Sequence, residues 1–373
     1  MEKHFFAGNN TSKGFYSYFD SVFNPEKANR IYILKGGPGV GKSSFMKKIA
    51  SRLREKNSIE YVHCSSDNES LDGIFIPELN IGFVDGTAPH TLDPTIPGAA
   101  DEIINLGIFL DGGKLEAFKD QIVACNRKMS RIYKSAYRYL SCAGLVSDEI
   151  NSIYDNCTDY KKFTILSEKI IYKLFGGRSS AEPLNPGGRK LFAEAYSADG
   201  YINYTDALCA DKSVWGIKGN SINLSSALLE RILAEAALRG CHTDCFYHPL
   251  HPEKLRHLLI ADLDIMLVST ESQSLGNYDE TIHLEQLTDF DMLKRYKAEL
   301  ENNGLLYDLL IDNALEKLSE TKKEHAVLEA YYISSMDFNG VDACFETVCS
   351  KLAPTHSGPE FISVTGPQPK LSL

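Results

Sequence analysis

Short apolar runs alternate with amphipathic stretches along most of the chain. The run Ile31–Leu34 predicts a buried strand, and the next stretch places apolar side chains on one helical face, at Phe45, Met46, Ile49, Ala50 and Leu53. Further strands are expected near Glu60–His63, Ile81–Val84 and Ile103–Leu106. Strands that are apolar on both faces and that alternate with helices are typical of a parallel sheet covered on both sides. The pattern therefore predicts an α/β fold.

The hydrophobic pattern occurs twice. Three segments of the first half match three segments of the second half in the same order: FFAGNNTSKGFYSYFD (5–20) with LFAEAYSADGYINYTD (191–206), ILKGGPGVGKSSFM (33–46) with GIKGNSINLSSALL (216–229), and residues 63–86 with 247–270. Each copy is followed by a helical stretch, roughly 113–175 and 289–353. An internal duplication is the simplest explanation. We expect tandem α/β domains, each followed by a helical segment.

Composition sets the boundaries of the two copies. Residues 176–188 (GGRSSAEPLNPGG) are rich in Gly, Pro and Ser, which is typical of a linker. The expected organisation is a first domain at 1–177, a linker at 178–188, a second domain at 189–353 and a flexible tail at 354–373.

The first copy contains a phosphate-binding motif. Residues 36–43 (GGPGVGKS) satisfy the Walker A pattern G-x-x-x-x-G-K-[ST], between an apolar strand and an amphipathic helix. Glycines allow backbone N–H groups to turn inward onto a phosphate, and the helix N-terminus adds its positive dipole end. Lys42 supplies a full positive charge. The expected nucleotide-binding residues are Gly36, Gly37, Pro38, Gly39, Val40, Gly41, Lys42, Ser43 and Ser44.

A metal ligand is expected at the end of a neighbouring strand. The run Ile81–Val84 ends in Asp85, a Walker B pattern, and the carboxylate together with the Ser43 hydroxyl would hold Mg²⁺. The alternative is that Asp85 only begins a turn, since Gly86 follows it.

The residue that activates water is not evident, because Gly86 stands where many ATPases carry a glutamate. Asp67 and Asp72 in the polar segment CSSDNESLDG are the preferred candidates, since ligands bind beyond the carboxyl ends of strands in open α/β sheets. The other candidates are Glu69, Glu78 and His90. Each of these side chains has an alternative role as a solvated or structural residue.

The second copy has lost the motif. Leu224 and Ser225 align with Gly41 and Lys42, and Ile222 aligns with Gly39. In addition, Asp85 is matched by Ser269, and Asp72 by Arg256. The lysine and the metal carboxylate are both missing, so we expect a degenerate copy that no longer hydrolyses nucleotide.

Charge and cysteine content limit the partners. The net charge of -11 is concentrated in the second half, which argues against a polyanionic partner such as DNA or RNA. The longest apolar run, Leu258–Val268, is interrupted by Asp262 and Asp264, so no membrane span is expected. Nine cysteines without a disulfide-framework spacing are typical of a reducing compartment, and we expect a cytoplasmic protein.

The blocks FFAGNNTSKGFYSYFD, ILKGGPGVGKSSFMKKIA, HCSSDNESLDGIFIPEL and DGTAPHTLDPTIPGAADEIINLG resemble a group of bacterial two-repeat P-loop NTPases, usually labelled ATPases. The resemblance covers nearly all of the chain before the tail. It implies a nucleoside triphosphate hydrolase fold with nucleotide bound at Gly36–Ser43. Members often keep a recognisable loop in the second repeat, and this chain departs from them at Leu224 and Ser225.

Sequence and resemblance together predict a Mg²⁺-dependent ATPase with one competent and one degenerate site. ATP is preferred over GTP because no N-K-x-D element is present. Two other functions stay open: a small-molecule or nucleotide kinase, and a non-catalytic nucleotide sensor. A sensor would use its helical segments to bind a protein partner or a second copy of the chain.

Overall fold

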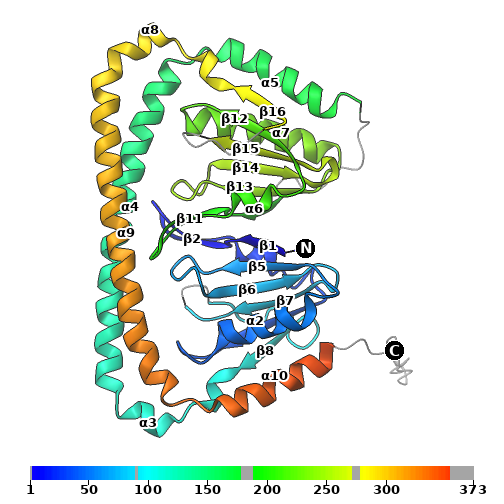
Figure 1. Cartoon of the computed structure of the whole chain (residues 1–373), viewed down its shortest axis with the longest axis vertical. Coiled ribbons are helices and arrows are strands. Elements are labelled where there is room, and N and C mark those ends of the chain that lie inside the picture. The colour runs from blue at the N-terminus through cyan, green and yellow to red at the C-terminus, as the bar shows by residue number, and fades with distance from the viewer. Residues whose placement is uncertain (1, 89–90, 178–187, 271–277, 353–373) are drawn as a thin grey trace, which may run out of the picture.

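The computed structural model describes residues 2–88, 91–177, 188–270 and 278–352. Two α/β lobes lie one above the other, and a long antiparallel pair of helices runs along one side of both (Figure 1). The expected linker, except for Gly188, and the expected tail 354–373 lie outside the described residues.

The first lobe is built on a six-stranded sheet in the order β1-β5-β6-β7-β4-β8. Its strands are β1 (Glu2–Phe5), β4 (Arg30–Lys35), β5 (Ile59–His63), β6 (Leu71–Ile76), β7 (Ile81–Asp85) and β8 (Asp101–Asn105). Neighbours are parallel except for β6, which is antiparallel to both β5 and β7. Helices α2 (Lys42–Leu53) and α10 (Phe338–Leu352) share one hydrophobic core with this sheet.

The second lobe repeats this plan in the order β16-β12-β15-β14-β13-β9. Its strands are β9 (Arg189–Leu191), β12 (Ser213–Lys218), β13 (Thr243–Tyr247), β14 (Leu255–Ile260), β15 (Ile265–Thr270) and β16 (Glu280–His283). Here β14 is the antiparallel strand, in the place of β6. Helices α5 (Tyr160–Phe175) and α7 (Ile222–Leu238) contribute to its core.

The two sheets confirm the predicted α/β class, and they are mostly rather than fully parallel. Their registers also agree with the alignment of the two copies: Leu34 lies opposite Asp85, and Ile217 lies opposite Ser269. Strand β6 was not predicted, because Asp72 and Gly73 interrupt its apolar pattern.

The lobes meet where equivalent residues pair. Phe6 and Phe192, which are aligned in the two copies, exchange two backbone hydrogen bonds: the Phe6 N–H donates to Phe192 O (2.8 Å) and the Phe192 N–H to Phe6 O (2.9 Å). Beside this bridge lie two small hairpins, β2 (Gly8–Thr11) with β3 (Gly14–Ser17) and β10 (Glu194–Ser197) with β11 (Gly200–Asn203). Reciprocal pairing of equivalent residues places a pseudo-twofold axis between the lobes.

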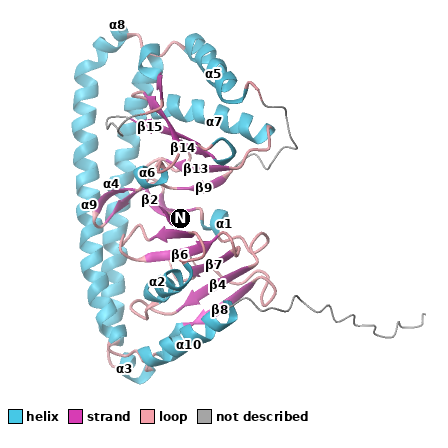
Figure 2. Cartoon of the chain, turned by 45° about the vertical axis from the view of Figure 1, so that its right-hand side comes forward, coloured by secondary structure: helices cyan, strands magenta, loops and turns pink. Residues whose placement is uncertain are grey.

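Each long helix leads from one lobe to a helix that packs on the other lobe. Helix α4 (Lys119–Asn156) leaves the first lobe and leads to α5, which packs on α7 of the second lobe. Helix α9 (Lys297–Ile333) runs back antiparallel to α4 and leads to α10, which packs on α2 of the first lobe (Figures 1 and 2). Each lobe is therefore completed by a helix from the other half of the sequence, so the packing units do not follow the continuous ranges 1–177 and 189–353.

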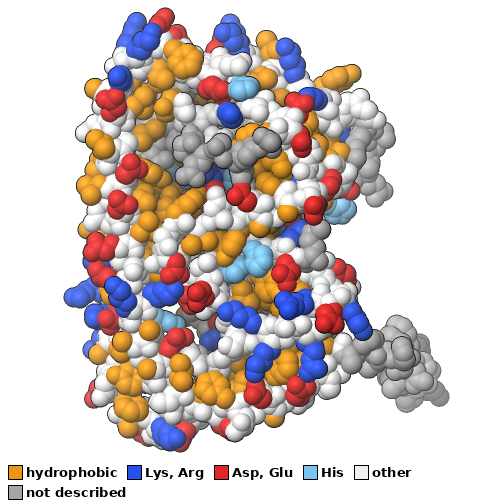
Figure 3. All heavy atoms as spheres, viewed as in Figure 1, with side chains coloured by type: hydrophobic (Ala, Val, Ile, Leu, Met, Phe, Trp, Pro, Cys, Tyr) orange, Lys and Arg blue, Asp and Glu red, His pale blue; other side chains and the backbone are white. Residues whose placement is uncertain are grey.

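The remaining helical elements are short. They are α1 (Phe19–Val22), η1 (Leu106–Phe109), α3 (Gly112–Glu116), α6 (Thr205–Leu208), η2 (Ala261–Leu263), η3 (Leu284–Leu287), α8 (Phe290–Leu293) and η4 (Lys294–Tyr296). Among the described residues, no helix is both long and apolar enough to cross a lipid bilayer. Acidic and basic side chains are interspersed over the face shown in Figure 3.

A buried group of charges joins the lobes near the pseudo-twofold axis. The Arg189 guanidinium donates to both carboxylate oxygens of Glu60 (2.6 and 2.9 Å) and of Asp244 (2.9 Å each), and Lys3 lies 3.7–3.8 Å from the same carboxylates. Burial alone would raise the pKa of Asp244, but the charge of Arg189 holds that pKa below its ordinary value. Arg189 thus connects a strand of each lobe through paired hydrogen bonds.

We predict that Arg189→Met destabilises the chain by about 3–5 kcal/mol, because Glu60 and Asp244 are then left with Lys3 alone. The shift of the urea unfolding midpoint measures this loss. Lys294→Met is the matched control, because its partner Asp291 is an exposed residue one helical turn away, and a change within about 0.5 kcal/mol is expected. Equal shifts for the two variants would show that the interlobe charges are not a major source of stability.

Candidate functional site

The segment between β4 and α2 has a backbone that only glycine adopts easily. Gly39 has φ of 70° and Gly41 has φ of 92°, both in the left-handed region. Gly41 is also the N-cap of α2 and has no side chain with which to cap the first turn. An uncapped helix N-terminus that follows a glycine loop offers its N–H groups to an anion.

Lys42 lies over this loop. Its ammonium donates to the carbonyls of Gly36 (3.1 Å) and Gly37 (2.9 Å) and lies 3.6 Å from Oδ2 of Asp85. Both charged side chains are mostly buried, at 10% and 17% exposure. Strand pairing brings them together, because Asp85 ends β7 directly opposite Leu34 of β4. The structure therefore places a lysine and a carboxylate side by side at the carboxyl edge of the sheet.

Ser43 and Asp85 provide oxygen donors of the kind that Mg²⁺ prefers. Asp85 Oδ1 accepts hydrogen bonds from the Thr87 N–H (2.9 Å) and hydroxyl (2.6 Å), which fixes the carboxylate. The Ser43 hydroxyl oxygen accepts from the Leu71 N–H (3.0 Å). In the described part of the chain, no three His, Cys, Asp or Glu side chains gather as a metal site. Mg²⁺ bound to phosphates needs only one or two protein ligands, so this donor set fits it.

The two preferred carboxylates for water activation have different surroundings. The sequence had suggested that Asp72 lies in a loop. It is instead a buried residue of β6. Leu71, the residue before Asp72, donates its backbone N–H to the Ser43 hydroxyl oxygen. Asp72 itself lies at an irregularity in the pairing of β6 with β5, and its carboxylate is hydrogen-bonded to the Cys64 thiol. Asp67 lies in the loop between β5 and β6 and forms an ion pair with Lys322 of α9 (2.8 Å). Asp72 thus lies one residue from a backbone contact with Ser43, whereas Asp67 attaches the loop to α9.

The other candidates lie elsewhere. Both carboxylate oxygens of Glu78 accept from the Ser58 N–H (3.0 Å each), next to the start of β5 and therefore at the opposite edge of the sheet. Glu69 has an exposed side chain, and only its backbone carbonyl contacts α2, through Lys47. His90 is outside the described residues.

The end of α9 covers the glycine loop, a feature that the sequence did not suggest. A Cβ at Gly37 would lie 2.4 Å from the Tyr332 ring, and one at Gly39 would lie 2.9 Å from Ile333 Cγ1 and 3.1 Å from the Glu329 carbonyl. Side chains at either glycine would clash with α9. These contacts link residues almost 300 positions apart, and no local pattern could reveal them.

The equivalent segment of the second lobe is helical. Helix α7 begins at Ile222, so the positions that match Gly39 to Gly41 form its first turn, and Ser221 caps it by accepting from the Leu224 N–H (3.1 Å). One contact is retained: Ser226 accepts from the Leu255 N–H (2.9 Å), as Ser43 does from Leu71. The serine contact is therefore kept, whereas the glycine loop, the lysine and the carboxylate are not.

Side chains of α4 occupy the N-terminus of α7. The Asn151 amide oxygen accepts from the Ile222 N–H (2.7 Å). The Asp155 carboxylate accepts from the Ser221 hydroxyl (2.8 Å) and from the side-chain amide of Asn223 (2.7 Å). Backbone N–H groups that could bind an external anion at this helix N-terminus are thus taken by Asn151 and Ser221, and a carboxylate lies beside them. At this helix end, backbone N–H groups of α7 donate to side chains of the chain itself.

Comparison with known proteins gave no match among family models, curated proteins or solved structures. The chemistry of the site therefore has to follow from its own geometry. That geometry consists of the glycine loop, the uncapped start of α2, and Lys42 beside Asp85.

Proposed function

We propose that the first lobe binds a nucleoside triphosphate with Mg²⁺, ATP being the expected nucleotide, and hydrolyses it. The observation that carries this proposal is the ion pair between Lys42 and Asp85 at the mouth of the glycine loop. A mostly buried lysine and carboxylate next to an uncapped helix N-terminus match a ligand that brings both negative charge and a divalent cation.

Each residue has a distinct task. Backbone N–H groups of Gly36–Ser43, other than Pro38, which has none, would surround the phosphates. Lys42 would turn from the loop carbonyls to the phosphate oxygens. Ser43 and Asp85 would hold Mg²⁺, which would withdraw charge from the phosphate oxygens. Asp72 follows Leu71, whose N–H contacts the Ser43 hydroxyl oxygen, and is the preferred carboxylate to orient water. Gly86 provides no carboxylate, so we expect slow turnover.

The second lobe is proposed to be non-catalytic. Its loop residues are helical, and Asp155 occupies the start of α7. The chain would then belong with two-repeat P-loop NTPases in which one repeat has become a partner domain. Nine free cysteines favour a reducing, cytoplasmic setting.

A nucleotide sensor is the second candidate, and the position of α9 favours it. Tyr332 and Ile333 contact the glycine loop, while the same helix extends along the second lobe. Nucleotide binding that moved the loop would move this helix. Tight binding of ATP without phosphate release would support the sensor, whereas a phosphorylated small acceptor would identify a kinase.

We predict that Lys42→Ala weakens binding of Mg–ATP by about 100-fold or more and abolishes phosphate release, because a charge-assisted contact to the phosphates is lost. Calorimetry and a phosphate-release assay measure the two effects. Ser225→Ala is the matched control, since Ser225 has the equivalent position and its hydroxyl only donates to carbonyls of its own helix turn. Equal damage from the two substitutions would mean that the second lobe is also a working site.

We predict that Asp85→Asn makes ATP binding much less dependent on Mg²⁺ and leaves the binding of the phosphates by the loop in place. The amide oxygen can still accept from the Thr87 N–H, but it lacks the charge that attracts the cation. A titration of ATP binding against Mg²⁺ is the measurement, and the gain in affinity on adding Mg²⁺ should fall at least tenfold. Asp93→Asn, an exposed carboxylate nearby that pairs with Lys35, should leave the titration unchanged. An unaltered Mg²⁺ response in Asp85→Asn would refute its assignment as a metal ligand.

A further inference from the structure

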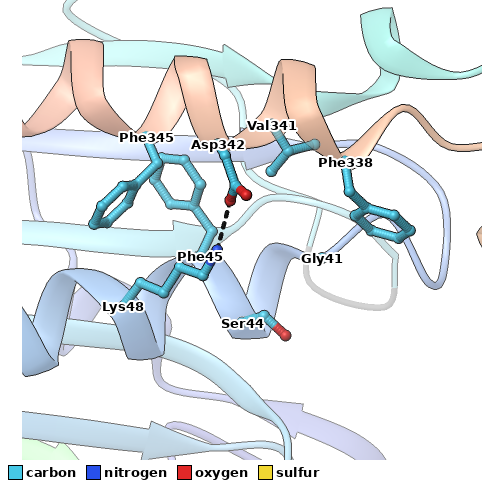
Figure 4. Close-up of a pocket in the computed structure, with 8 residues that line it drawn as sticks. All are labelled: Gly41, Ser44, Phe45, Lys48, Phe338, Val341, Asp342 and Phe345. Carbon is cyan, nitrogen blue, oxygen red and sulfur yellow. Dashed lines mark hydrogen bonds and ion pairs between the residues drawn. The ribbon is translucent and has the colours of Figure 1, made fainter.

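A cavity of about 270 Å³ opens between α2 and α10 next to the glycine loop (Figure 4). Four apolar side chains form much of its wall, and one ion pair lies at its rim. The lining residues are Gly41, Ser44, Phe45, Lys48, Phe338, Val341, Asp342 and Phe345. None of these residues except Gly41 and Ser44 belongs to the phosphate loop or its immediate continuation.

The cavity continues the phosphate site on the side away from Asp85. Strand β4 leads into the loop and has β7, which carries Asp85, on one side and β8 on the other. Helix α10 lies on the β8 side, where Gly340 packs against Phe109 in the turn that follows β8. A phosphate chain with its metal end at Asp85 would therefore extend past Gly41 and Ser44 towards this cavity.

The chemistry of the cavity suits a flat aromatic ring. Phe338 is 44% exposed, and its ring edge would lie 3.8 Å from a Cβ at Gly41. Val341 lies beside it and extends the apolar wall. A base that stacks on Phe338 would cover this exposed ring, and stacking requires no particular base sequence or hydrogen-bond pattern.

The polar rim can form hydrogen bonds with the edge of such a ring. The Lys48 ammonium and the Asp342 carboxylate lie 2.5 Å apart, and both side chains are more than half exposed. Together they offer a donor and an acceptor beside the apolar wall, which matches the mixed donor and acceptor edge of a purine. The volume of the cavity also admits a two-ring base.

We propose that this cavity is the base-binding subsite of the nucleotide site and that it takes the purine of a nucleoside triphosphate. The proposal rests on the function proposed above. It adds that the site is made from both halves of the sequence, because α2 comes from the first copy and α10 is the last described helix of the chain. Exchange of helices between the lobes would thus complete the nucleotide site.

The test compares ATP with inorganic tripolyphosphate, both with Mg²⁺, by calorimetry on the full chain. Phe338→Ala should weaken ATP binding about tenfold or more and leave tripolyphosphate binding unchanged, since only ATP has a base to stack. Phe338→Tyr keeps the ring and should retain most of the affinity for ATP. Tyr172→Ala, an exposed aromatic residue of α5 in the second lobe, is the control and should change neither ligand.

The outcomes separate the subsite from the phosphate site. If wild-type chain binds neither ligand, the proposed function itself fails. If Phe338→Ala weakens both ligands equally, Phe338 supports the loop and the base-binding subsite is overturned. It is likewise overturned if ATP binding is unchanged in Phe338→Ala. A larger loss for ATP than for tripolyphosphate, together with weaker binding of UTP than of ATP by the wild-type chain, supports a purine subsite.

Discussion

The left-handed backbone at Gly39 and Gly41 is the constraint on which the candidate site depends. It stops the helix from starting early and leaves a loop over which Lys42 can lie. The second lobe shows the effect of losing these glycines. Ile222 and Leu224 occupy the matching positions, and the segment there forms the first turn of α7. Side chains with a Cβ favour the helical conformation over the left-handed one. The two lobes thus form an internal comparison of one topology with and without the glycines.

The exchange of helices gives the two copies different partners at equivalent places. In the first lobe, the end of α9 lies on the glycine loop through Tyr332 and Ile333 and leaves room for a ligand beside α10. In the second lobe, the matching end of α4 brings Asn151 and Asp155 onto the start of α7. Side chains of α4 therefore lie on the helix start of the second lobe, where the first lobe has an uncapped helix start. The same exchange places one long helix, α9, in contact with both the glycine loop and the second lobe.

Much of the fold follows from local pattern, and the rest depends on distant contacts. Apolar runs located β4, β5 and β7, and the repeat alignment predicted the correspondence of Asp85 with Ser269 that the strand registers show. Strand β6 escaped prediction because Asp72 and Gly73 resemble loop residues, although Asp72 is buried. The contact of Phe338 with the loop had no sequence signal, since it requires α9 to return across the whole molecule. Local patterns encode periodicity and turn chemistry, and they do not encode which helix covers which lobe.

The stoichiometry of nucleotide binding tests the difference between the lobes most directly. Calorimetric titration of the full chain with a non-hydrolysable Mg–ATP analogue should give one nucleotide per chain, bound at the loop that contains Lys42. Two nucleotides per chain would contradict the closure of the second lobe by Asp155, and no binding at all would contradict the nucleotide site in the first.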